Sequence, residues 1–208
     1  MNFKAENWNV VVVGAWNRAI LTPQWIAKNM FKVPEGTALP VEVPINVRAP
    51  MKISHDGCGV IVHSSQLEVL TENADFHSLE KAKQLSLEAV NELNRTPFLA
   101  AGFNIRFLSE GDIDPDFAEL LSCKLDAKIA SAGHQITKRN VTQTFPFRGG
   151  QVNLQISSSD DTATLDLNFH KTSTTAEEVT SWLQMPITEI ESTTNSILEN
   201  IGVTTTDL

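Results

Sequence analysis

The sequence predicts a protein of the α+β class, built mainly on an antiparallel sheet. Several segments alternate apolar and polar residues with a period of two, which indicates strands that have one solvated face. Two other segments, residues 78–95 and 174–201, place their apolar residues at helical spacing, which indicates amphipathic helices. An apolar fraction of 41% and a charged fraction of 20% are typical of soluble globular proteins.

The first element is a strand that contains the valine run Val10–Val13. Because these four residues are all apolar and do not alternate, we expect both faces of the strand to be covered. A short helix follows, with Thr22 as its N-cap and Pro23 at its first position. An alternating segment at 41–47 lies among prolines 40, 44 and 50, which favours a strand at a sheet edge.

The next part of the chain is expected to contain one or two hairpins, then a helix and a strand. Asp56-Gly57 is a strong candidate for a hairpin turn. The helix at 78–95 and a strand within 98–108 then complete the order strand, helix, strand, strand, helix, strand. This is the order of a ferredoxin-like unit, so we expect a ferredoxin-like first half.

The second half is predicted to contain a three-stranded antiparallel meander between residues 134 and 170. A capping box that starts at Thr174 opens a long C-terminal helix, which we expect to be kinked at Pro186 and to end at Gly202. Residues 203–208 are expected to fray. The chain is interpreted as one domain, 1–208, with sub-halves of about 1–110 and 111–202.

Composition excludes several classes of function. The 25 acidic and 16 basic residues give a formal charge of −9, which argues against nucleic-acid binding, since that needs clustered Lys and Arg. No apolar run approaches the ~20 residues of a membrane span, and no secretion signal is evident. We therefore expect a cytoplasmic protein without membrane contact, with Cys58 and Cys123 reduced. No cofactor is expected.

The valine run ends at Gly14, as in the first turn of a nucleotide-binding unit. Such a turn needs three glycines and a helix that begins directly after them. Here Gly14 stands alone, Trp16 is bulky, and the helix begins only near Pro23. The sequence therefore predicts a core strand, with no nucleotide site.

His55, Cys58 and His63 form the strongest enzymatic candidate, as a zinc site or as a Cys–His pair in a small hydrolase or transferase. Side chains on a hairpin alternate between faces, so these three need not converge. A structural zinc site would also need a fourth ligand. The simpler interpretation is an ordinary hairpin.

Asp112, Asp114 and Asp116 resemble the start of a calcium loop, which leads to a third hypothesis, a small-molecule or metal-binding sensor. An EF-hand would require glycine where Phe117 stands and glutamate where Cys123 stands. Capping of a helix that opens at Pro115 explains the aspartates better.

The favoured hypothesis is a non-catalytic protein-interaction or assembly subunit that binds a protein partner or associates with itself. The apolar stripe of the C-terminal helix is expected to be buried, either against the chain's own sheet or against a second subunit, and in the second case it is the interaction surface. The stripe consists of Ile190, Ile197, Leu198 and Ile201. Asn104 and Arg106 form a polar pair on one strand face, and they are expected either to line a pocket or, more simply, to face solvent.

Overall fold

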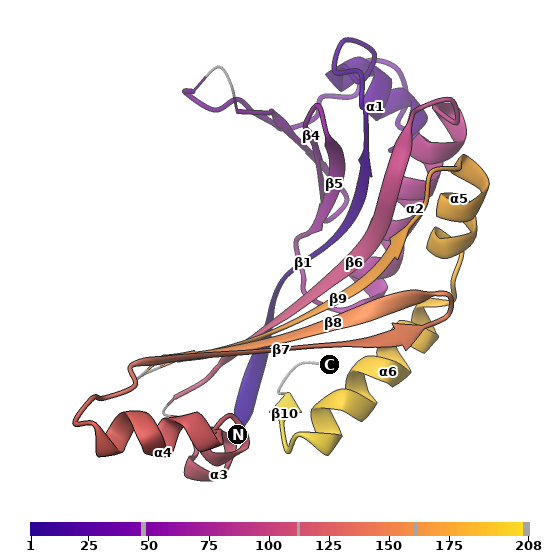
Figure 1. Ribbon diagram of the computed structural model, residues 1–208. Coiled ribbons are helices and arrows are strands. Elements are labelled where there is room, and N and C mark those ends of the chain that lie inside the picture. Colours follow the sequence, from indigo (N-terminus) through magenta and orange to yellow (C-terminus); the bar gives the residue numbers. More distant parts are fainter. Residues whose placement is uncertain (47–48, 112, 160–161, 206–208) are drawn as a thin grey trace.

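The structure is a computed structural model that describes residues 1–46, 49–111, 113–159 and 162–205. It has the predicted α+β class, with helices along a curved and mainly antiparallel sheet (Figure 1). The strands are β1 (Asn2–Gly14), β2 (Val41–Glu42), β3 (Lys52–His55), β4 (Cys58–Val62), β5 (Gln66–Thr71), β6 (Phe98–Ser109), β7 (Lys138–Phe147), β8 (Gly150–Ser159), β9 (Ala163–Thr172) and β10 (Thr204–Thr205). The helices are α1 (Pro23–Asn29), α2 (Phe76–Glu92), α3 (Pro115–Leu120), α4 (Lys124–Ser131), α5 (Ala176–Leu183) and α6 (Ile187–Asn200).

One sheet runs through both halves of the chain. Its strand order is β2-β3-β4-β5-β1-β6-β9-β8-β7, and each neighbour on this path is antiparallel. The halves are joined where β6 pairs with β9. The predicted meander is present as β7, β8 and β9. The ferredoxin-like interpretation of the first half stays a prediction: its strands lie in the order β4-β5-β1-β6, and β2 and β3 extend the sheet beyond β4.

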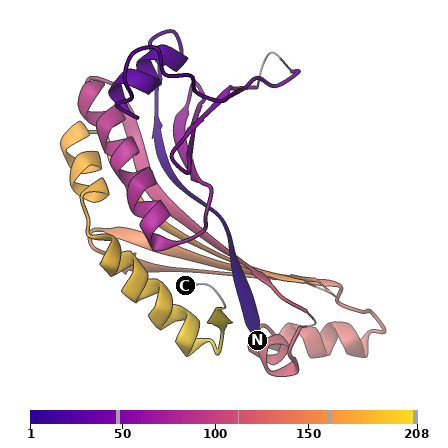
Figure 2. The same ribbon diagram turned by 180° about the vertical axis from the view of Figure 1, so that it is seen from behind.

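The hydrophobic core lies between the sheet and the helices on one of its sides. Figure 2 shows α2, α5 and α6 along this side, which we call the covered face. Trp8, Phe103, Phe107 and Phe169 are fully buried there. The opposite side carries no helix among the described residues over the central strands, and we call it the helix-free face.

The valine run shows that the expectation of two covered faces was wrong. Val10 and Val12 are fully buried, whereas Val11 and Val13 are only partly buried. Alternate residues of a strand point to opposite faces, so Val11 and Val13 lie on the helix-free face. A continuous apolar run therefore occurs here in a strand that is covered on one side only.

The long kinked C-terminal helix is instead two helices. Proline has no N–H, so Pro186 cannot continue the hydrogen-bonding pattern; α5 ends at Leu183, and α6 begins at Ile187. The buried Lys83 stabilises the segment between the two helices, because its Nζ donates a hydrogen bond to the carbonyl of Met185 at 3.3 Å. The same ammonium pairs with Glu80 at 2.6 Å.

Three further segments bear on the predictions. Asp114 caps α3 and Pro115 follows it, as expected, but α4 was not predicted. The alternating segment at 41–47 forms a ladder only at β2, and residues 47–48 lie outside the described part. The C-terminal residues are not all frayed, because Val203 is buried and β10 pairs with the start of β1.

Candidate functional site

The β3–β4 hairpin brings two of the three predicted site residues together. Asp56 and Gly57 have φ angles of 46° and 76°, which is the conformation of a type I′ two-residue turn. This turn pairs His55 directly with Cys58 across the hairpin. Directly opposed residues point to the same face of a sheet, so these two side chains lie side by side.

His55 and Cys58 face a cavity of about 320 Å³ on the covered face, between the hairpin, the start of α2 and the segment after α1. The His55 ring packs edge-on against Phe31, with ring centroids 5.4 Å apart. His77 and Glu80 of α2 also line this cavity. The cavity thus holds an imidazole, a thiol and a carboxylate in one region.

His63 lies at the other end of the hairpin. It follows β4, five residues along the chain from Cys58, and its backbone N–H donates to the carbonyl of Gln66. At about 3.3 Å per residue of strand, it is too far from His55 and Cys58 to share a ligand with them. Within the described residues, no group of three or more His, Cys, Asp or Glu side chains is arranged to hold a metal ion.

The chemistry of Cys58 does not favour nucleophilic catalysis. Its side chain is 3% exposed, and burial raises the pKa of the Cys58 thiol to about 11. Nearby Lys81 acts in the opposite direction on this pKa, but burial is the larger effect. A catalytic cysteine needs a lowered pKa so that the thiolate is present at neutral pH. The thiol at Cys58 therefore stays protonated.

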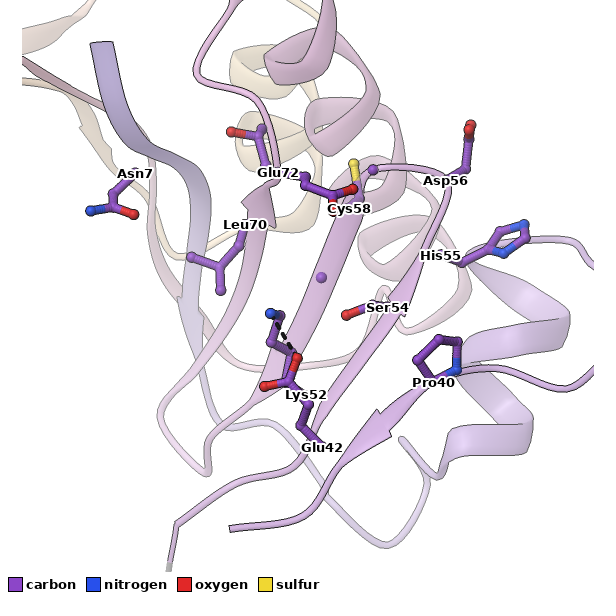
Figure 3. A pocket seen from close by; sticks show the side chains of 13 residues that line it. Asn7, Pro40, Glu42, Lys52, Ser54, His55, Asp56, Cys58, Leu70 and Glu72 are labelled. Carbon is purple, nitrogen blue, oxygen red and sulfur yellow. Dashed lines mark hydrogen bonds and ion pairs between the residues drawn. The ribbon is translucent and has the colours of Figure 1, made fainter. Parts of the chain in front are cut away.

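A larger hollow of about 560 Å³ lies on the other side of the same hairpin (Figure 3). Lys52 and Glu42 border it and are paired at 3.0 Å. Figure 3 shows the His55 ring on the opposite side of β3 from the side chains of Ser54 and Lys52. The two hollows lie on either side of the hairpin, and His55, Asp56 and Cys58 at its turn line both of them.

The aspartate cluster is explained by capping as far as the structure describes it. Asp114 Oδ1 accepts a hydrogen bond from the backbone N–H of Asp116 at 2.9 Å, at the first turn of α3. Asp116 lies in that turn, where a negative charge is favourable. Asp112 lies outside the described residues.

The predicted interaction stripe on the C-terminal helix faces the protein's own core. Ile190 and Leu198 are buried, so their side chains are not available to a partner. Ile197 and Ile201 are partly buried and pack against the same core. Of the two expected positions of the stripe, the structure shows docking on the chain's own core. A role of these residues in binding a second subunit stays a prediction.

A row of amide side chains crosses the helix-free face at one level of the sheet. Asn104, Asn168 and Asn153 stand in register on neighbouring strands, and Asn9 pairs with Asn104 on the other side. We call these four residues the amide row. It connects to Glu68 at one end and to Thr144 at the other, and so extends over β5, β1, β6, β9, β8 and β7.

The hydrogen bonds of the amide row all run in one direction. Asn153 Nδ2 donates to Asn168 at 3.0 Å, Asn168 to Asn104 at 2.7 Å, and Asn104 to Asn9 at 2.6 Å. Asn9 Nδ2 then donates to the Glu68 carboxylate at 2.7 Å. Aligned hydrogen bonds polarise one another, and this series of bonds ends at the Glu68 carboxylate. Each amide still has a second N–H with which it can bind another molecule, and the oxygens of Asn9, Asn104 and Asn168 each keep a lone pair. The Asn153 oxygen already accepts from Thr144 and Gln151.

A hollow of about 310 Å³ lies beside the amide row on the same face. Gly102 lines this hollow and has no side chain to fill it. A Cβ atom at this position would meet the Phe169 carbonyl oxygen at 2.9 Å. Val11 and Val13 supply apolar lining, and Glu68 and His170 supply polar groups. This hollow was not predicted, although Asn104 was recognised as belonging to a polar pair.

One signal in the sequence was available for the amide row. Asparagine is a poor strand former, yet Asn9, Asn104, Asn153 and Asn168 all occupy strand interiors. Positions at which the residue contradicts the local structure are expected at functional sites. What the sequence alone could not supply is the register that places the four amides in one row. Arg106, the other member of the predicted polar pair, faces solvent and pairs with Asp166 at 2.6 Å.

Exposed aliphatic side chains gather on two segments that project from the sheet. The first, residues 39–46, which we call the arm, extends from the top of the molecule in Figure 1, and α3 and α4 project at the bottom. Five of the seven large hydrophobic residues that are exposed in the described part lie on these segments. They are Val41, Val43, Ile45, Leu120 and Leu125.

Comparison with models of known protein families finds no match, and comparison with curated proteins finds no significant one. None of the described helices is long and apolar enough to cross a membrane.

Proposed function

We propose that this protein is a non-catalytic interaction or assembly subunit, which binds a protein partner over the helix-free face between the arm and the α3–α4 segment. The observation that carries the proposal is the exposed aliphatic side chains on both of these projecting segments. Val43 is 71% exposed and Ile45 is fully exposed, and neither contributes to the core. Large apolar side chains that gather on an otherwise polar surface are typical of protein-interaction sites.

The surface between the two segments suits a protein partner. The amide row offers donors and acceptors that match peptide groups and polar side chains, and Val11 and Val13 add apolar lining nearby. Protein interfaces combine a few apolar anchors with hydrogen-bonding groups in this way. The formal charge of −9 makes nucleic acid an unfavourable partner.

The alternative of a small hydrolase or transferase has weaker support. His55 and Cys58 are adjacent, but the raised pKa of Cys58 removes the nucleophile at neutral pH. His63 does not belong to the same cluster.

A partner-recovery experiment tests the proposal. The protein is cross-linked to its partners in its native source, and recovery is compared for wild type, the double variant Val43→Asp with Ile45→Asp, and the control Leu99→Asp. Leu99 is also an exposed aliphatic residue, but it belongs to β6 and to neither of the two projecting segments. We expect the arm variant to lose the partner by about tenfold or more, because anchor residues contribute 1.4 kcal/mol or more to binding.

The control variant is expected to recover the partner at the wild-type level. Because Val43 and Ile45 are exposed, the arm variant should keep the wild-type melting temperature, so any loss reflects binding. Equal recovery of every partner from all three proteins would contradict a binding role for the arm.

A further inference from the structure

The two edges of the sheet differ in how they are protected. The edge strand β2 has only two ladder residues, and Pro40 and Pro44 flank it. Short strands and prolines are common means by which proteins prevent edge-to-edge pairing. The opposite edge strand, β7, has ten residues, and among the described residues it forms a ladder only with β8.

The turn after β7 determines which backbone groups of this strand face outward. Arg148 and Gly149 have φ angles of 45° and 74°, so they form a type I′ turn that closes on Phe147 and Gly150. In such a hairpin the closing residues are hydrogen-bonded to each other, and alternate residues then point their N–H and C=O groups away from the partner strand. Asn140, Thr142 and Thr144 are therefore outward positions.

Pro146 agrees with this assignment. It is also an outward position, at which the missing N–H of proline removes no hydrogen bond from the β7–β8 ladder. Between Asn140 and Phe147 the strand has no charged residue that would oppose pairing. Its only charged residues are Lys138 and Arg139, at the end remote from the turn.

We propose that β7 pairs in antiparallel orientation with β7 of a second copy of this chain, about a two-fold axis at Thr142. This register places Asn140 opposite Thr144 of the second copy, so the backbone bonds run through the three outward residues between Lys138 and Pro146. Pro146, like the prolines beside β2, offers no N–H to a neighbouring strand. The register also puts Lys138 opposite Pro146 of the second copy, so the two positive ends lie at opposite ends of the interface. A parallel arrangement would place these like charges together, which is unfavourable.

Two-fold pairing of this kind has a further consequence for the helix-free face. Even-numbered residues of β7 share this face with the amide row, because Thr144 donates to Asn153. The two-fold axis at Thr142 places the helix-free faces of both copies on the same side of the joined sheet. The polar side chains of these two faces then form one continuous surface across the interface. The contact proposed for β7 is made by the backbone of the sheet edge with a second copy of this chain, whereas the proposed function depends on the arm and on a different partner.

Disulfide trapping tests the register. Thr142→Cys in a Cys123→Ser background should form a covalent dimer under mild oxidation, since residues opposed across the axis have Cβ atoms within reach of each other. Gln155→Cys in the same background is the matched control, because Gln155 is exposed, lies opposite Thr142 on β8, and is one strand away from the edge. We expect a dimer from the first protein and a monomer from the second. Equal cross-linking of both, or of neither, would overturn the proposal.

A second measurement tests the backbone pairing. Sedimentation over a concentration series compares Thr142→Pro, which removes an outward N–H, with Thr142→Val, which keeps it. We expect concentration-dependent dimerisation of wild type and Thr142→Val, and a loss of dimer in Thr142→Pro with unchanged circular dichroism. A wild-type chain that stays monomeric at all concentrations would overturn self-pairing, even if the edge captured a strand of another protein. Neither variant alters the arm, so this outcome is independent of the partner-recovery experiment.

Discussion

The two faces of the sheet are built from alternate residues of the same strands, yet they follow different rules. On β6, Phe103 and Ile105 are buried under the helices, whereas Asn104 between them joins the amide row. The covered face consists of apolar residues that are buried in the core, and these residue types favour strands. The helix-free face contains asparagines that weaken strands. The difference indicates that the covered face maintains the fold, whereas strand propensity and core packing do not account for the asparagines of the helix-free face.

The largest expected effect concerns α6 on the covered side. Ile190→Ala with Leu198→Ala should lower the free energy of unfolding by about 2–5 kcal/mol for each residue, because both side chains are buried. Typical proteins have only ~5–15 kcal/mol in total, so the double variant should be largely unfolded or melt far below wild type.

Denaturant unfolding at several protein concentrations checks this prediction. Since α6 docks on its own chain, the loss should be the same at every concentration. Ile197→Ala is the milder control, because Ile197 is only partly buried. A double variant that stays folded with the wild-type melting temperature but loses an oligomer would show that this stripe binds a second subunit.

The second prediction concerns Cys58, also on the covered face. With its pKa raised to about 11 by burial, the thiol should have about 100-fold less thiolate at neutral pH than an ordinary cysteine, whose pKa is near 9. A thiol reagent should therefore label Cys58 slowly near pH 7, and faster as the pH rises toward 11.

The variant Cys123→Ser isolates the reaction of Cys58, and Cys58→Ala isolates that of the exposed Cys123. We expect Cys123 to react first. Labelling of Cys58 faster than a free thiol would reverse this order and favour the enzymatic hypothesis.

Gly102 gives a smaller effect, on the helix-free face. In Gly102→Ala, the new Cβ would meet the Phe169 carbonyl oxygen at 2.9 Å, which is backbone and cannot move without shifting β9. Overpacking of this kind costs about 1–3 kcal/mol. Thermal unfolding measures the loss, and Gln155→Ala, at an exposed position on the same face, should stay within about 0.5 kcal/mol of wild type. A neutral Gly102→Ala would show that this face is less closely packed than the structure indicates.

The sequence predicts features that depend on neighbouring residues better than features that depend on long-range packing. Local signals were sufficient for the turn at Asp56-Gly57, the Asp114 cap and the β7–β9 meander, because each depends on neighbouring residues. The valine run was misjudged, since periodicity cannot reveal whether a helix covers the second face. The break at Pro186 was underestimated because the apolar stripe continues through it, although the missing N–H ends the helix.

The candidate site was harder to predict, because it depends on strand register. His55 and Cys58 meet only because the hairpin pairs them, and the amide row forms only because Asn9, Asn104 and Asn168 align across three strands. Nothing within each strand specifies this alignment. The sequence did contain the polar pair on β6, but only long-range pairing separates Asn104, which joins the row, from Arg106, which faces solvent.

The smallest expected change in stability, and the most direct test of the two faces, is Asn104→Thr. The substitution loses hydrogen bonds with Asn9 and Asn168, each worth about 0.5–1.5 kcal/mol, but it gains strand propensity of up to ~1 kcal/mol. The freed groups reach water, so no burial penalty is added and the net change should stay within about 1 kcal/mol. The adjacent Phe103→Ala, on the covered face, should cost about 3–5 kcal/mol. Denaturant unfolding of both variants gives the comparison. If Asn104→Thr costs as much as Phe103→Ala, the amide row is structural; if stability is retained while partner recovery falls, the row is part of the binding surface.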